Sequence, residues 1–210
     1  MMKEKGIDAG IDVGSPHIIQ VVGYKNTGKT TMTASLIAGL ATKGLKVAAI
    51  KHDGHDHFEM DQEGTDSYQF GKAGAAAVAV MSRNRTAILK QQHTGLEDML
   101  KEFSQYDWVV VEGFKQAAYP KLVMVRHEAD LKLVSQLQSV VGIVFWSPDL
   151  LEEAESRGDK SLSSFLFNDK ETIVEAVVQL NRLVGKEEAT MQAFNEDDDK
   201  DIDKHEDDGA

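Results

Sequence analysis

The sequence has no cysteine among its 210 residues, which excludes disulfide bonds and thiolate metal sites. No stretch approaches the roughly 18 uninterrupted apolar residues of a membrane span, and residues 1–14 lack the apolar core of a signal peptide. No stripe of basic residues is present, which disfavours nucleic-acid binding. These absences favour a cytoplasmic protein that binds neither membranes nor nucleic acid.

The acidic excess lies mainly at the C-terminus. From Glu196 to Ala210 there are nine Asp or Glu and two Lys, which supply −7 of the formal net charge of −12. Such a block has too few apolar groups to offset the entropy lost on ordering, so we predict a largely disordered acidic tail over residues 187–210. The alternative is a tail that docks on a basic partner or binds cations. The sequence is 41% hydrophobic, which is enough for a core, so we predict one domain over residues 17–186. A flexible extension over residues 1–16 should precede it.

The strongest motif is GYKNTGKT at residues 23–30, which fits the phosphate-binding pattern G-x-x-x-x-G-K-[S/T] at every fixed position. It lies between a β-branched run at residues 17–22 and a helical pattern at 31–41, as such a loop should. Backbone N–H groups and the start of the helix would hold phosphate oxygens. Lys29 should bridge the β- and γ-phosphates, and Thr30 should place its hydroxyl on Mg²⁺. The sequence therefore predicts a site for a nucleoside triphosphate with Mg²⁺.

Strand and helix patterns alternate after this loop. We expect strands at residues 45–50, 76–81, 86–89, 108–111, 122–125 and 140–145, and helices at 65–72, 96–103 and 168–184. The short connections of the first strand-helix-strand unit favour a right-handed crossover, parallel strands and helices on the faces of the sheet. The sequence therefore predicts an α/β fold.

Two carboxylates follow predicted strands. Glu112 ends the most strongly apolar strand, and Asp53 lies just beyond the second. Carboxyl ends of parallel strands form the ligand crevice of such sheets, and a carboxylate there can hold Mg²⁺ or polarise the attacking water. We predict Glu112 and Asp53 as the catalytic residues, and both of them with Thr30 as the metal site.

A histidine-rich segment, KHDGHDH, follows at residues 51–57. Imidazoles and carboxylates at this spacing can ligate transition metals. Three histidines on a glycine-containing loop without cysteine are more often solvated or bound to anions, so Lys51 and His52 could instead contact the phosphate of a second substrate.

Together these blocks resemble the molybdopterin-guanine dinucleotide biosynthesis adapter protein B family over roughly residues 17–185. The residues that carry the resemblance are Gly23 to Thr31, Lys51-His52-Asp53-Gly54-His55, Asp61 with Asp66-Ser67, Ala73-Gly74-Ala75, Val111 to Lys115, and Pro120-Lys121 through Arg126. The Lys-His-Asp and Val-Glu-Gly-Phe-Lys blocks are not shared by nucleotide-binding proteins generally.

The resemblance implies a GTP-binding adapter with weak GTPase activity that assists the guanylyltransferase joining GMP to molybdopterin. It also implies a homodimer and the three-layer phosphate-loop NTPase fold, a mostly parallel sheet with added antiparallel strands and helices on both faces. The implied nucleotide-binding residues are Gly23, Lys25, Asn26, Thr27, Gly28, Lys29, Thr30 and Thr31. A basic rim, made of Lys51, His52, Lys115 and Arg126, would face the pterin phosphate or the partner enzyme.

Two other functions stay open on the residues alone. One is a small-molecule kinase acting at the same crevice, and the other is a metallochaperone-like GTPase that uses His52, His55 and His57. The sequence contains no Asn-Lys-x-Asp block to read guanine, and Asp149, in an expected loop after residues 140–145, is the one carboxylate we can suggest for that task. The choice of GTP over ATP therefore rests on the resemblance.

Overall fold

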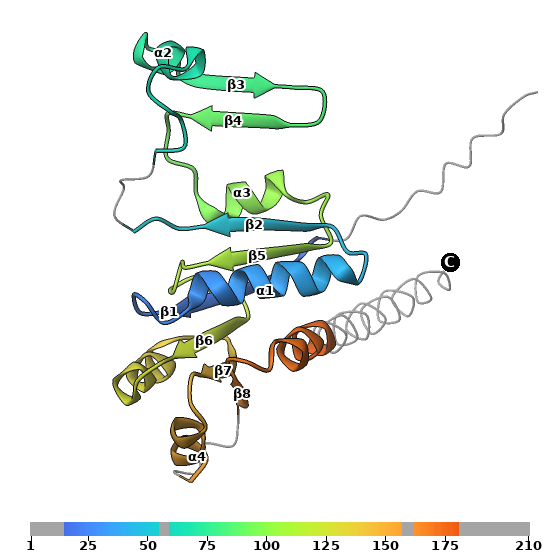
Figure 1. Cartoon of the computed structure of the whole chain (residues 1–210), viewed down its shortest axis with the longest axis vertical. Coiled ribbons are helices and arrows are strands. Elements are labelled where there is room, and N and C mark those ends of the chain that lie inside the picture. The colour runs from blue at the N-terminus through green and yellow to red at the C-terminus, as the bar shows by residue number, and fades with distance from the viewer. Residues whose placement is uncertain (1–14, 55–58, 157–161, 181–210) are drawn as a thin grey trace, which may run out of the picture.

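The structure, a computed structural model, describes residues 15–54, 59–156 and 162–180. Its main sheet has six parallel strands in the order β2-β5-β1-β6-β7-β8 (Figure 1). The strands are β1 (His17–Gly23), β2 (Val47–Lys51), β5 (Trp108–Glu112), β6 (Lys121–Val125), β7 (Val140–Phe145) and β8 (Ser163–Leu166). Because all six strands run the same way, the loops that follow them meet at one edge of the sheet.

Helices cover both faces of this sheet. On one face, α1 (Lys29–Thr42) packs on β1 through Met32, Leu36 and Leu40, beside the helical residues 170–180. The other face carries α3 (Leu96–Glu102), the 3-10 helix η1 (Glu128–Gln136) and α4 (Pro148–Ser156). The strands alternate their apolar side chains between these two layers, so β1, β5 and β6 are buried on both sides. The predicted three-layer α/β fold is confirmed.

A smaller lobe lies beyond the β2 edge of the main sheet (Figure 1). It consists of α2 (Asp66–Lys72) and an antiparallel pair, β3 (Ala77–Met81) and β4 (Thr86–Lys90). The side chain of Thr65 begins α2 by accepting a hydrogen bond from the backbone N–H of Tyr68. The expected antiparallel strands are therefore present, and they form a sheet of their own.

The prediction of a loop around Asp149 is wrong. Pro148 begins α4, and Asp149 lies in its first turn. The local reason is that proline suits the first helical position, while the hydroxyl of Ser147 accepts a hydrogen bond from the backbone N–H of Leu150 at 3.4 Å. The short strand β8 was not expected, because its sequence, SSFL, has little apolar alternation.

Several predictions fall on residues that the structure does not describe. These are residues 1–14 of the N-terminal extension, the acidic tail over 187–210, the end of the last helix near residue 184, and the side chains of His55 and His57. Among the described residues, none of the helices has the length and apolar character needed to cross a membrane.

Candidate functional site

The phosphate loop, residues 23–30, joins β1 to α1 and has a backbone that only certain residues can adopt. Asn26 and Gly28 have positive φ angles of 63° and 88°. A Cβ on Gly28 would lie 2.8 Å from the Trp146 ring, and one on Gly23 would lie 2.5 Å from the Thr27 hydroxyl. Both motif glycines are therefore required by close packing, and Gly28 also by its left-handed conformation.

Side chains from outside the loop hold its carbonyl groups. Arg126 donates to the Asn26 carbonyl at 2.9 Å, and the indole N–H of Trp146 donates to the Thr27 carbonyl at 2.8 Å. The guanidinium of Arg126 also lies over the Trp146 ring, 4.8 Å from its centroid. With these carbonyls bound on the outside, the loop favours turning its N–H groups inward, which is the arrangement that holds anions. Arg126, expected on the basic rim, thus contacts the phosphate loop itself.

Lys29 lies within the phosphate loop, where its ammonium group donates to the Tyr24 carbonyl at 2.7 Å. Burial lowers the pKa of Lys29; the Glu112 carboxylate opposes this shift, and the ammonium groups of Lys115 and Lys51 add to it. Three of the predicted lysines therefore act electrostatically on one another. Such a group of cations around one carboxylate favours a polyanion such as a triphosphate.

Glu112 lies where the sequence predicted, at the carboxyl end of β5 and opposite the phosphate loop. Parallel pairing sets it between β1 and β2, and it is 7% exposed. Its Oε1 accepts a hydrogen bond from the Thr30 hydroxyl at 3.1 Å and lies 3.4 Å from the Lys51 ammonium. Thr30 and Glu112 thus form a pair of hard oxygen donors of the type that suits Mg²⁺. Asp53 lies two residues beyond β2, on the wall of a neighbouring cavity.

The loop after β5, residues 113–120, is held at both ends by buried polar side chains. Gln20, fully buried in β1, donates to the carbonyls of Gly113 and Phe114 at 3.1 and 3.0 Å. Those two residues have positive φ angles of 99° and 49°, so the chain turns sharply there. Lys121, also fully buried, donates to the carbonyls of Ala117, Tyr119 and Gln138, and burial lowers its pKa. This loop is consequently fixed relative to β1 and β6.

Two predicted rim residues are positioned by that loop and by β2. The Lys115 ammonium lies 4.6 Å from the centroid of the Tyr24 ring, directly beside the phosphate loop. His52 follows β2 and its ring contacts Phe114, with 4.4 Å between the ring centroids. Lys25 and Thr31, the remaining predicted nucleotide contacts, are exposed on the loop and on the first turn of α1.

Trp146 and Phe167 are site residues that the sequence analysis missed. They come directly after β7 and β8, whose parallel register brings their rings into a stack with centroids 4.2 Å apart and planes at 11°. Both rings lie against Gly28. For Trp146 the available signal was its place directly after the apolar strand expected at residues 140–145, at the carboxyl edge of the sheet. Phe167 had no such signal, because β8 was not expected.

We expect Trp146→Phe to weaken binding of a triphosphate while leaving the ring stack in place. The change removes the N–H group and leaves the buried Thr27 carbonyl unpaired, a loss of about 1–3 kcal/mol, or roughly five- to a hundredfold in affinity. Titration with GTP and with inorganic tripolyphosphate should show the same loss for both ligands. A loss for GTP alone would mean that Trp146 contacts the base and does not support the loop.

The histidine-rich segment is described only in part. His52 is described and is packed on Phe114, whereas His55 and His57 lie outside the described residues. Within residues 15–54, 59–156 and 162–180, no group of three or more His, Cys, Asp or Glu side chains is placed to hold a metal ion.

Comparisons with known proteins place these features in a family. The family model described as molybdopterin guanine dinucleotide synthesis protein B matches residues 18–146. The molybdopterin-guanine dinucleotide biosynthesis adapter protein of Escherichia coli (strain K12) is 35% identical over 118 residues, or 53% of this chain and 67% of that protein. The protein of the same name from Haemophilus influenzae is 34% identical over 115 residues, and the match spans 53% of this chain and 64% of the relative's length.

A solved structure agrees with the sequence relatives. The crystal structure of Bacillus subtilis MobB is 29% identical, covers 78% of this chain and 96% of its own, and superposes with a TM-score of 0.65. The residues matched by the family model, 18–146, include the smaller lobe and five of the six strands of the main sheet.

Proposed function

This chain belongs to the molybdopterin guanine dinucleotide synthesis protein B family. From that premise we propose that it has the adapter role of its relatives, binds GTP with Mg²⁺, hydrolyses it slowly and assists the guanylyltransferase that attaches GMP to molybdopterin. The observation that carries the proposal is the phosphate loop with the hydroxyl of Thr30 beside the carboxylate of Glu112, 3.1 Å apart. We also propose a cytoplasmic location, which suits a chain without cysteine.

Each residue of the site has a distinct task in this proposal. The loop and Lys29 would bind the phosphates, Thr30 and Glu112 would hold Mg²⁺ with Asp53 as a further candidate ligand, and the metal would supply positive charge that neutralises the phosphates. Lys51 and Lys115 bring further positive charge to the carboxyl edge of the sheet. The carboxylate of Glu112 accepts one hydrogen bond, from Thr30, and pairs with one cation, Lys51.

The smaller lobe supports the proposal of a homodimer. Met81 and Ile88 lie on one face of the β3–β4 pair and are 76% and 59% exposed. An isolated two-stranded sheet is marginally stable, and apolar side chains on its open face favour cover by another chain. We propose that a second copy supplies that cover. Sedimentation analysis should show a dimer, and Ile88→Lys should shift it toward monomer.

Two measurements test the functional proposal. Titration of the purified protein with GTP and ATP in the presence of Mg²⁺ should show tighter binding of GTP. Transfer of GMP to molybdopterin by the guanylyltransferase should then rise when this protein is added, while its own GTP turnover stays slow. Equal affinity for ATP would overturn the choice of nucleotide. Rapid phosphorylation of a small acceptor without the transferase would establish the kinase alternative instead.

A further inference from the structure

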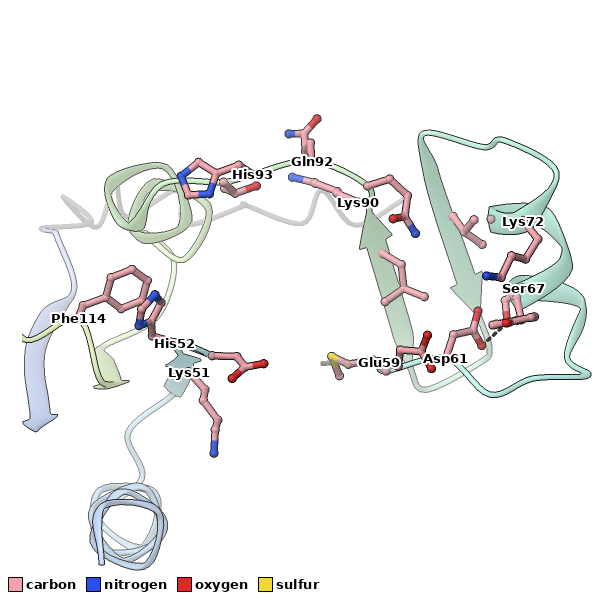
Figure 2. A pocket seen from close by; sticks show the side chains of 18 residues that line it. Lys51, His52, Glu59, Asp61, Ser67, Lys72, Lys90, Gln92, His93 and Phe114 are labelled. Atoms are coloured by element: carbon pink, nitrogen blue, oxygen red, sulfur yellow. Dashed lines mark hydrogen bonds between the residues drawn. The ribbon is translucent and has the colours of Figure 1, made fainter. Parts of the chain in front are cut away.

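A cavity of about 830 Å³ lies between the end of β2 and the smaller lobe. Figure 2 shows Lys51, His52 and Phe114 on one side of it, and Glu59, Asp61, Ser67 and Lys72 on the other. This volume is in the range of small-molecule sites, roughly 300–1,000 Å³. The cavity is therefore large enough for a ligand of the size of a nucleotide or a reduced pterin.

The walls combine three kinds of chemistry. Lysine side chains come from separate elements, with Lys51 on β2, Lys72 on α2 and Lys90 on β4. The ammonium of Lys90 also pairs with Glu102 of α3, an exposed carboxylate that a phosphate would have to displace. Aromatic rings line both sides, Phe114 from the loop after β5 and Tyr68 from α2. Carboxylates complete the lining, among them Glu59 and Asp61. Lysines suit a phosphate group, rings suit a flat heterocycle, and carboxylates accept the N–H donors at a heterocycle's edge.

The cavity adjoins the nucleotide site through Lys51. The ammonium of Lys51 lies 3.4 Å from Glu112, whose carboxylate contacts Thr30 of the phosphate loop. Phe114, on the cavity wall, is two residues from Glu112 in the chain. A ligand in the cavity would therefore lie next to the γ-phosphate end of a bound triphosphate, on the side away from the Trp146–Phe167 stack.

We propose that this cavity binds the second substrate of the reaction, an aromatic heterocycle that carries a phosphate monoester. Lysines of the cavity lining supply the positive charge that holds the phosphate, and the heterocycle packs against the ring of Phe114 or of Tyr68 with its polar edge toward the carboxylates. The proposal rests on the proposed function for the identity of this ligand as a pterin. It assigns the residues of the smaller lobe, Tyr68, Lys72 and Lys90, to ligand binding.

Gly71 of α2 provides a way to close the cavity without disturbing the fold. It lines the cavity, and a Cβ at this position would meet only the amide nitrogen of Gln91, at 3.8 Å. Leucine also favours a helix more than glycine does. Gly71→Leu should therefore fill the space, whereas Gly71→Ala, the matched control, should leave most of it open.

The test uses 6-hydroxymethylpterin monophosphate as the probe, with pterin fluorescence as the readout, and the full chain as the protein. We expect the wild type and Gly71→Ala to bind it, Gly71→Leu to lose tenfold or more in affinity, and the unphosphorylated pterin to bind more weakly. Lys90→Gln should weaken binding several-fold. Lys101→Gln, which alters an exposed lysine paired with Asp98 outside the cavity, should change nothing.

Affinity for GTP is measured on the same variants and should not change. Absence of probe binding to the wild type would overturn the proposal, as would equal binding to wild type and Gly71→Leu, because the probe would then lie elsewhere. If the probe binds as expected and GTP does not bind to any variant, the cavity assignment holds and the proposed function fails. The two failures are thus distinguishable.

Discussion

Replacing Lys29 by alanine is expected to abolish triphosphate binding while leaving the fold intact. The phosphates lose the ammonium group that contacts the backbone of the loop, and truncation of one partner of a buried charge pair costs about 2–5 kcal/mol, or roughly thirtyfold to several thousandfold in affinity. In the structure without ligand, Lys29 contributes one hydrogen bond, to the Tyr24 carbonyl, and no core packing. Its removal should therefore alter the melting temperature little.

Calorimetric titration with GTP and thermal unfolding, carried out on the same samples, would check this expectation. Lys43→Ala is a suitable control because Lys43 is an exposed lysine at the opposite end of α1. Wild-type affinity in Lys29→Ala would refute the assignment of residues 23–30 as a phosphate site.

Glu112→Gln is expected to lower Mg²⁺-dependent GTP hydrolysis by tenfold or more, as for the loss of a metal ligand or general base, while binding of nucleotide without Mg²⁺ persists. The amide keeps the size of the side chain and its hydrogen bond with Thr30, and removes the negative charge. Asp53→Asn should have a similar effect. A phosphate-release assay over a range of Mg²⁺ concentrations measures both variants.

Asp98→Asn serves as the control for these two variants, since it neutralises an exposed carboxylate on α3 that pairs only with Lys101 in the described structure. If Glu112→Gln and Asp53→Asn both hydrolyse GTP at the wild-type rate, neither carboxylate serves the metal. If Glu112→Gln slows GTP hydrolysis and Asp53→Asn does not, the proposed metal role of Asp53 is wrong and Asp53 belongs to the cavity wall only.

The sequence was sufficient to predict the features that depend on local pattern and strand direction. The apolar run before Gly23 and the one ending at Glu112 identify two strands, and their parallel pairing was enough to expect Glu112 near Thr30. The Trp146–Thr27 and Gln20–Gly113 contacts could not be predicted, because they join residues 119 and 93 positions apart. A glutamine within an apolar strand has many possible partners, and only the packed structure selects one.

The turn at Gly113–Phe114 lies between the two proposed ligand sites. In the proposed arrangement Glu112 would serve the nucleotide and Phe114 the cavity ligand, while Gln20 binds the carbonyls of Gly113 and Phe114 to the centre of the sheet. A displacement of one side chain would then act on the other through a single short stretch of restrained backbone. Any change that GTP makes in the affinity of the cavity ligand must be matched, by thermodynamic reciprocity, by an equal change in the affinity for GTP. The occupancy of each site would then depend on the other ligand, so the doubly bound form would be favoured only when both ligands are present. That property would suit a protein that assists another enzyme.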